Sequence, residues 1–241
     1  MVVTCLANLY LFIYCSLMTK HVTVQLGQLA PPLELSEWVQ GGPLNIGDLK
    51  GKVIVIEVFQ VNCPGCFLYG IPEAVEIAKA YSNKGVAVLG LATAFEDFEL
   101  NTLENLKLLL REGKPVGETL RALRIQGLLD NQMKIPYKIP FPIAMDKLIR
   151  EETPPGDERI FKFATSNIPD FELYHQKDKS EILERVKQYL ESKVYSSITF
   201  EEYALKGTPS TIYIDKQGNL QGITFGSQGS MKYEVEQLLH S

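Results

Sequence analysis

The chain has 241 residues, of which 45% are hydrophobic and 22% are charged, as is ordinary for a globular protein of one large or two small domains. Its formal net charge of −5, and the lack of a lysine and arginine cluster interleaved with aromatics, argue against a nucleic-acid-binding protein. Four cysteines are too few for a disulfide-stabilised scaffold of this length.

Residues 1–21 form an apolar leader with no charged side chain before Lys20. Residues 2–18 are just long enough to span a bilayer, but a signal peptide carries its basic residues ahead of the apolar run. Two interpretations stay open. Either translation starts at Met18 and the protein is cytoplasmic, or the leader anchors or exports it. Cys5 and Cys15 lie in this leader and are predicted to be inert.

Residues 22–52 are broken by prolines and glycines into short extended pieces and turns. Two of these pieces, at 33–35 and 43–46, are predicted to form a small hairpin ahead of the core. The run that follows, at 53–61, is apolar, β-branched and short, and Glu57 is its one carboxylate. This pattern predicts a strand that is buried on both faces of a sheet.

The buried strand ends at Cys63-Pro64-Gly65-Cys66, and residues 71–81 then show the apolar spacing of a helix. The Cys-x-x-Cys turn is therefore expected where a strand ends and a helix begins, and Pro72 is expected to kink that helix. Unpaired N–H groups and the helix dipole at this position stabilise a thiolate. Cys63, the more exposed thiol, would attack a disulfide, Cys66 would resolve the product, and Pro64 would stiffen the loop.

The remaining elements are predicted from apolar periodicity and from the glycines and prolines that interrupt it. A right-handed crossover should join the first strand to a second parallel strand. A hairpin with glycine in its loop should precede a closing helix capped by Ser230. The predicted ranges are a strand at 86–92, helices at 101–111 and 118–125, a helix from Ser180, and strands at 210–214 and 220–225. A further strand, at 141–146, is implied only by the resemblance described next.

Three stretches resemble the thioredoxin-like superfamily, and its TlpA/redoxin branch most closely. They are the Cys63–Cys66 turn with Glu57 six residues before it, the segment 207–220 with Thr208-Pro209, and the lead-in at 26–52. The resemblance covers roughly 26–95 and 200–239. It implies an α/β thioredoxin fold over 22–241, in which helices flank a central mixed sheet. An N-terminal hairpin extension and a mostly helical insertion at about 97–200 would be added to that fold.

The resemblance also implies thiol–disulfide oxidoreductase activity and roles for individual residues. Glu57 would be a buried proton relay with a raised pKa. A cis-Pro209 would bring the Thr208 backbone beside the thiols, so that Thr208 and Pro209, with Pro64 and Gly65, contact the substrate. Partners would be protein thiols or disulfides and an unidentified redox partner. Neither nucleic acid nor a metal or organic cofactor is implied, and a membrane is implied only if the leader is an anchor.

Three other interpretations compete with this one. A Cys-x-x-Cys pair is half of a zinc site, but no further histidine or cysteine pair stands at ligand spacing. A peroxidase of the peroxiredoxin type would have threonine or serine and proline ahead of its cysteine, where Cys63 is preceded by Gln60 and Ile56. A binding module would not need both cysteines. Asn62 stands where thioredoxins usually have tryptophan, which leaves the substrate surface and the redox potential open.

Overall fold

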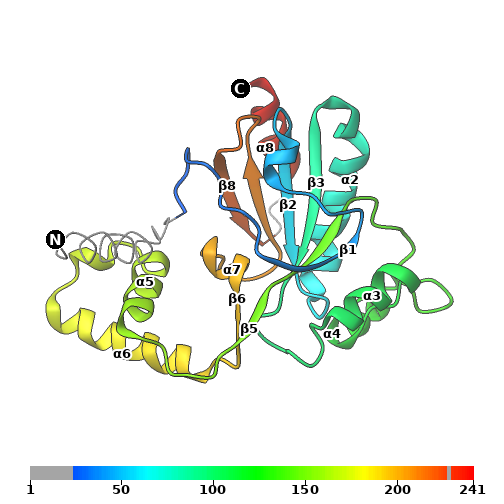
Figure 1. The fold of residues 1–241 in the computed structure, drawn as a ribbon. Coiled ribbons are helices and arrows are strands. Elements are labelled where there is room, and N and C mark those ends of the chain that lie inside the picture. Colours follow the sequence, from blue (N-terminus) through cyan, green and yellow to red (C-terminus); the bar gives the residue numbers. More distant parts are fainter. Residues whose placement is uncertain (1–23, 227–228) are drawn as a thin grey trace, which may run out of the picture.

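The computed structural model describes residues 24–226 and 229–241, so the predictions for the leader lie outside the described residues. Its centre is a six-stranded sheet of mixed direction in the order β1-β4-β3-β2-β7-β8 (Figure 1). β3 is parallel to β2 and β4, and the other neighbours are antiparallel. The predicted mixed sheet is confirmed. Its strands are β1 (Leu35–Gln40), β2 (Val53–Phe59), β3 (Val86–Ala92), β4 (Ile143–Asp146), β7 (Ser210–Ile214) and β8 (Leu220–Phe225).

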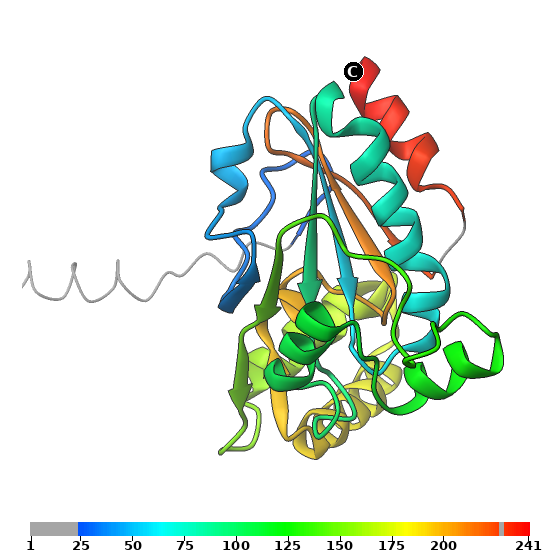
Figure 2. The same cartoon turned by 90° about the vertical axis from the view of Figure 1, so that its right-hand side faces the viewer.

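β2 lies in the interior of this sheet, and all seven of its residues are buried. On one face, Val53 and Val55 pack with α2 (Ile71–Tyr81) and α8 (Met231–His240). Figure 2 shows these two helices side by side along the same side of the sheet. On the other face, Ile54 and Ile56 pack with Tyr203 and neighbouring apolar side chains. A strand between two apolar layers needs apolar side chains in both directions, which explains the unbroken run in the sequence.

The crossover from β2 to β3 contains the cysteine turn, the π-helical turn η2 (Cys66–Gly70), α2 and the short 3-10 helix η3 (Ser82–Lys84). Pro72 lies in the first turn of α2, where a missing N–H is well tolerated. The helix irregularity that was expected at Pro72 therefore lies directly before α2, in the π-helical turn. Gly85 follows η3 with φ +83°, a left-handed conformation that glycine adopts at helix ends.

The predicted hairpin between 33–35 and 43–46 is not formed. β1 instead pairs antiparallel with β4, from Leu35 opposite Asp146 to Gln40 opposite Ile143. The second piece has no strand, since its end enters the 3-10 helix η1 (Ile46–Leu49). The reason is that β1 pairs with an edge of the sheet that would otherwise be unpaired. The Gln40 side chain also donates hydrogen bonds to the carbonyls of Ile139 and Phe141 (2.9 and 2.7 Å).

The range 97–200 is mostly helical but also contributes β4 to the central sheet. Before β4 it contains α3 (Leu103–Glu112) and α4 (Gly117–Ile125). After β4 come the ribbon β5 (Leu148–Arg150) with β6 (Tyr195–Ser197), α5 (Asp157–Asn167), η4 (Phe171–Leu173), α6 (Gln176–Ser192) and α7 (Ile198–Glu202). α5 and α6 project to one side of the sheet and share a small core of their own (Figure 1). The predicted helix start at Ser180 is wrong, because α6 begins at Gln176.

A buried carboxylate joins this helical part to the sheet. Asp146, at the end of β4, accepts hydrogen bonds from the N–H groups of Thr199 (2.9 Å) and Phe200 (3.1 Å) at the start of α7. It also accepts one from Thr93 Oγ1 (2.8 Å) at the end of β3. Burial raises the pKa of Asp146, and these donors oppose that shift.

Among the described helices, none combines the length and the apolar composition needed to cross a bilayer.

Candidate redox-active site

Cys63 follows the end of β2, Cys66 is the first residue of the π-helical turn, and the two form a disulfide with a Cα–Cα distance of 5.4 Å. The Cys66 N–H donates a hydrogen bond to Cys63 Sγ at 3.2 Å. Cys63 is 8% exposed and Cys66 is fully buried, so Cys63 is the sulfur that a second molecule can reach. An N–H directed at this sulfur would stabilise its thiolate in the reduced protein.

The segment that precedes β7 lies against this pair. The Thr208 carbonyl oxygen is 3.6 Å from Cys63 Sγ, and the Thr208–Pro209 peptide bond is cis. An added Cβ at Gly65 would lie 3.5 Å from Pro209 Cδ, so the two residues are adjacent. The Pro209 carbonyl accepts a hydrogen bond from the Gly226 N–H (2.9 Å), which ties the segment to the end of β8. The structure therefore brings the two predicted cysteines together with the predicted substrate-contact residues.

Glu57 is fully buried in the middle of β2. Its Oε2 accepts a hydrogen bond from Thr211 Oγ1 (2.9 Å) on the adjacent strand β7, while Oε1 has no hydrogen-bond partner among the described residues. Burial raises the pKa of Glu57 to about 8, the Thr211 hydrogen bond opposes the shift, and the charge of Glu73 adds to it. Glu57 is thus a buried acid that titrates near neutral pH.

A small cavity of about 10 Å³ adjoins Glu57 and is close in size to one water molecule. Its lining includes Glu73, Pro209 and Ser230 as well as Glu57. Glu73 Oε1 accepts a hydrogen bond from the Met231 N–H (2.9 Å), which fixes the start of α8 at this position. The Ser230 side chain makes no capping hydrogen bond, so the predicted Ser230 cap is replaced by the Glu73 carboxylate. Glu57 and Glu73 therefore line the same small cavity next to Pro209.

Gly70, at the end of the π-helical turn, lies against the Glu57 side chain. A Cβ at this position would collide with Glu57 Oε1 and would lie 2.8 Å from Pro209 Cβ. We therefore expect Gly70→Ala to destabilise the fold by about 1–3 kcal/mol, as overpacking of a core does. Urea unfolding measures the change. Gly47→Ala is the matched control, since a Cβ there meets nothing within 4 Å. Equal stability of the two variants would contradict this packing.

Sequence reasoning treated Asn62 only as a departure from the thioredoxin pattern, yet the structure places it in a buried polar network. Its side chain contacts Asp97 and the N-terminus of α4. Gln60, two residues earlier, also turns its side chain into this network. The available signal was the presence of two polar residues, Gln60 and Asn62, directly after an apolar run, because polar side chains buried at the end of a strand need hydrogen-bond partners.

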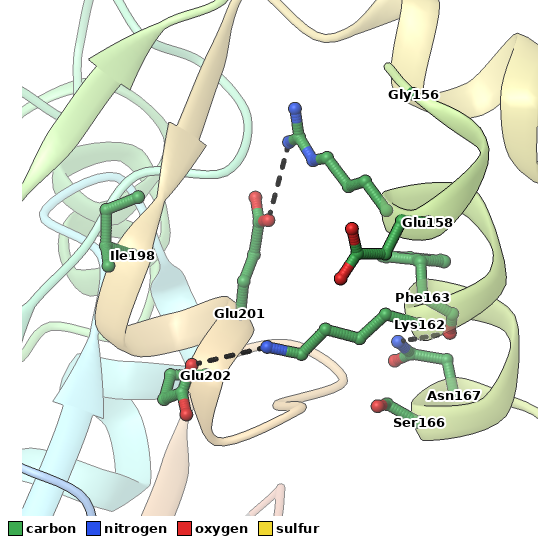
Figure 3. Close-up of a pocket in the computed structure, with 10 residues that line it drawn as sticks. Gly156, Glu158, Lys162, Phe163, Ser166, Asn167, Ile198, Glu201 and Glu202 are labelled. Carbon is green, nitrogen blue, oxygen red and sulfur yellow. Dashed lines mark hydrogen bonds and ion pairs between the residues drawn. The ribbon is translucent and has the colours of Figure 1, made fainter. Parts of the chain in front are cut away.

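A second cavity, of about 420 Å³, lies between α5 and α7 and includes none of the predicted site residues (Figure 3). Lys162 Nζ and Glu202 Oε2 are 3.7 Å apart across it, as Figure 3 shows. Arg159 pairs with Glu201 in the same way (3.6 Å). Acidic and basic side chains thus neutralise each other here, and the cavity is separate from the disulfide.

Known proteins with a similar fold are found by comparison of sequence and structure. No family model matches the chain. Protein FixW of Rhizobium leguminosarum is 32% identical over 77 residues, which are 31% of this chain and only 33% of FixW. A solved thioredoxin-like superfamily protein is 29% identical, with a TM-score of 0.53 over 89% of this chain and 98% of the other. A thiol-disulfide isomerase from Corynebacterium glutamicum is 26% identical, with a TM-score of 0.54 over 88% and 96%. Together with the mixed sheet and the cysteine pair at the end of β2, these similarities support a thioredoxin-like family for this chain.

Proposed function

We propose that this protein is a thiol–disulfide oxidoreductase whose Cys63–Cys66 pair alternates between disulfide and dithiol. The observation that carries the proposal is the position of Cys63 Sγ, which accepts a hydrogen bond from the Cys66 N–H and lies beside the Thr208 carbonyl, in a residue that is 8% exposed while Cys66 is fully buried. The likeness to the C. glutamicum thiol-disulfide isomerase supports it. Within the superfamily we assign the chain to the TlpA/redoxin branch, with 22–241 as the domain and 97–200 as its insertion.

The proposed reaction has two exchanges. The Cys63 thiolate attacks one sulfur of a protein disulfide, which forms a mixed disulfide and releases the other sulfur as a thiolate that takes up a proton. Cys66 then loses its proton and attacks Cys63 Sγ. This second step forms the Cys63–Cys66 disulfide and releases the substrate as a dithiol. Two electrons pass from the protein to the substrate, and the sequence runs backwards when the protein acts as an oxidant.

Glu57 is proposed to take the proton from Cys66 in the second exchange. A carboxyl group with a pKa of about 8 is partly ionised at neutral pH, so it can accept a proton and release it again without a large free-energy difference. It adjoins Pro209 and Gly70, which lies one helical turn after Cys66. The small cavity beside Glu57, which Gly70 and Pro209 also line, offers room for one water molecule that can exchange a proton with the carboxyl group.

The substrate is proposed to be an extended polypeptide that carries a disulfide or a thiol. The Thr208 carbonyl is directed at Cys63 and belongs to the segment between Gly207 and β7, so a chain that reaches Cys63 passes this backbone. Pro64 and Gly65 would contact the same substrate chain, since Gly65 lies against Pro209. A backbone hydrogen bond to Thr208 would align many substrate sequences, because it requires no particular side chain.

Disulfide exchange by the full chain tests the proposal. With dithiothreitol as electron donor, we expect the protein to accelerate reduction of the interchain disulfides of insulin. Alkylation after equilibration in glutathione buffers of graded potential should show the Cys63–Cys66 pair passing from disulfide to dithiol. A pair that never interconverts would overturn the proposal, as would thiol-dependent peroxide consumption without any reduction of insulin.

A further inference from the structure

We propose that Asn62 is a positioning residue for disulfide exchange: it ties the reactive Cys63 to the α3–α4 segment, so that residues 97–119 hold the cysteine in its attacking geometry. This inference rests on the proposed function. It assigns a role to Asn62, which stands directly before Cys63 and is 8% exposed. The argument depends on how completely its polar atoms are used.

Both ends of the Asn62 side-chain amide have a partner in the α3–α4 segment or in the loop that precedes it. Nδ2 donates a hydrogen bond to Asp97 Oδ2 at 2.8 Å. Oδ1 accepts a hydrogen bond from the Glu118 N–H, in the first turn of α4, at 2.7 Å. An amide side chain in this position accepts a hydrogen bond from one segment and donates a hydrogen bond to the other. An apolar side chain of similar size can make neither of these hydrogen bonds.

The backbone around Asn62 is held by the same two segments. The Asn62 N–H donates to Asn101 Oδ1 (2.8 Å), and Thr119 Oγ1 donates to the Val61 carbonyl (2.9 Å). Asn101 also donates through Nδ2 to Gln60 Oε1 (3.1 Å). Four hydrogen bonds thus act on the two residues before Cys63, and all four come from beyond β3. We call this group, Asn62 with Asp97, Asn101, Glu118 and Thr119, the Asn62 clamp.

The backbone of the clamp is built for close contact. Asp97 has a φ of +46°, which a non-glycine residue rarely adopts, and its carbonyl accepts the N–H groups of Leu100 and Asn101 (both 2.9 Å). Gly117 has a φ of +53°, and a Cβ there would collide with Asn62 Oδ1 and would lie 2.9 Å from Leu100 Cδ1. The rare backbone conformation of Asp97 and the need for glycine at position 117 both occur where the chain contacts the Asn62 side chain. They indicate that the surrounding interactions fix the geometry of this contact.

The clamp matters for chemistry because the reactive sulfur depends on small distances. The Cys66 N–H reaches Cys63 Sγ at 3.2 Å, and this hydrogen bond favours the thiolate over the thiol. If the residues before Cys63 shift, that hydrogen bond lengthens, the thiolate loses stabilisation, and the sulfur is less often in line for attack. Displacements of about 1 Å or less are enough to lower the rate of a reaction that depends on orientation.

Reversing the direction of one hydrogen bond separates the clamp from a merely structural role. In Asn62→Asp, one carboxylate oxygen still accepts from Glu118, but the other replaces the Nδ2 donor and faces the Asp97 carboxylate. We expect insulin reduction to slow about tenfold, within the range that coupled pairs produce. The Cys63 pKa, measured from the pH dependence of iodoacetamide alkylation, should rise. In the double variant Asn62→Asp/Asp97→Asn, the amide at position 97 donates back to position 62, and both quantities should return most of the way to wild type.

The double variant also controls for charge, since it keeps the new carboxylate beside Cys63. If it is as slow as Asn62→Asp, charge rather than the clamp causes the loss, and the inference is overturned. Gly117→Ala disturbs the same contact without any charge and should also slow exchange, which keeps the test open if Asn62→Asp does not fold. Asn83→Asp, at an exposed position, is the matched control. If wild type reduces insulin but Asn62→Asp and Gly117→Ala do so equally well, the clamp is wrong; if wild type itself is inactive, the proposed function fails.

Discussion

The Cys63→Ser variant should lose disulfide exchange by on the order of 10³-fold or more, because a covalent mechanism cannot proceed without its nucleophile. A serine hydroxyl does not ionise in the range where the Cys63 thiol does, and the Cys66 N–H therefore has no thiolate to stabilise. Cys66 cannot substitute for it, since its side chain is fully buried behind Cys63. Insulin reduction with dithiothreitol measures the loss.

The Cys66→Ser variant should fail differently. Cys63 still attacks the substrate disulfide, but no second thiol resolves the product, so a mixed disulfide should accumulate and be visible on a non-reducing gel. The double variant Cys5→Ser/Cys15→Ser is the control and should retain exchange, because these cysteines stand in the leader, far from position 63 in the sequence. A Cys63→Ser variant that still forms mixed disulfides would show that another cysteine is the nucleophile.

The core of the fold could be predicted because its signals are local in the sequence. The apolar run of β2, the cysteine turn and the helical spacing of α2 follow one another along the chain, and each has its own periodicity. The partner of β1 could not be found in this way. In the sequence, two strands of the sheet (β2 and β3) and the helices α2, α3 and α4 separate β4 from β1, and nothing in the short stretch Leu35–Gln40 indicates which edge it will join.

The site divides along the same line. Cys63, Cys66, Thr208 and Pro209 were found from motifs, and the structure brings them within contact of one another. The Asn62 clamp was missed because its hydrogen bonds join residues 35, 39 and 56 positions apart, and the partners of Asn62 lie outside the ranges 26–95 and 200–239 that the family resemblance covers. A polar side chain at the end of an apolar strand has many possible partners, and only the tertiary structure selects among them.

The helical part after β4 shows a third case. A mostly helical insertion was predicted, with α6 as its one individually predicted helix after β4, but the attachment was not predicted because it depends on one buried carboxylate. Asp146 resembles an ordinary polar residue at the end of a strand until the N–H groups of Thr199 and Phe200 are seen to converge on it. Burying an acid without such donors would be costly. The position of α7, and with it the wall of the cavity between α5 and α7, therefore follows from β4.

Glu57→Gln should slow disulfide exchange and stabilise the fold, two effects in opposite directions from one buried group. The amide cannot take a proton from Cys66, and loss of a general base of this kind lowers a rate by about 10²-fold or more. The amide oxygen can still accept the Thr211 hydroxyl, so the packing of β2 against β7 is kept. An exposed carboxylate on α2 gives the control, Glu76→Gln, which should change neither quantity.

The pH dependence of stability tests the buried acid independently of activity. The Glu57 pKa is about 8 in the folded protein and 4.5 as a free side chain. Below pH 4.5 both states are protonated, and the residue costs nothing. Between pH 4.5 and 8 the unfolded chain releases its proton while the folded protein keeps it, so the free energy of unfolding falls by about 1.4 kcal/mol per pH unit. Above about pH 8 the loss is complete, at about 5 kcal/mol.

A glutamine side chain has no proton to release, so the stability gap between Glu57→Gln and wild type should widen as pH rises from 4.5 to about 8 and then level off. Urea unfolding at a series of pH values measures it. The prediction for the exchange rate and the prediction for the stability can fail separately. A constant gap would mean that Glu57 is ionised in the folded protein, whereas a widening gap with a wild-type exchange rate would leave Glu57 buried and neutral but remove it from the proton path. If both effects are observed, one and the same buried carboxylate lowers the stability of the fold and takes the proton from Cys66.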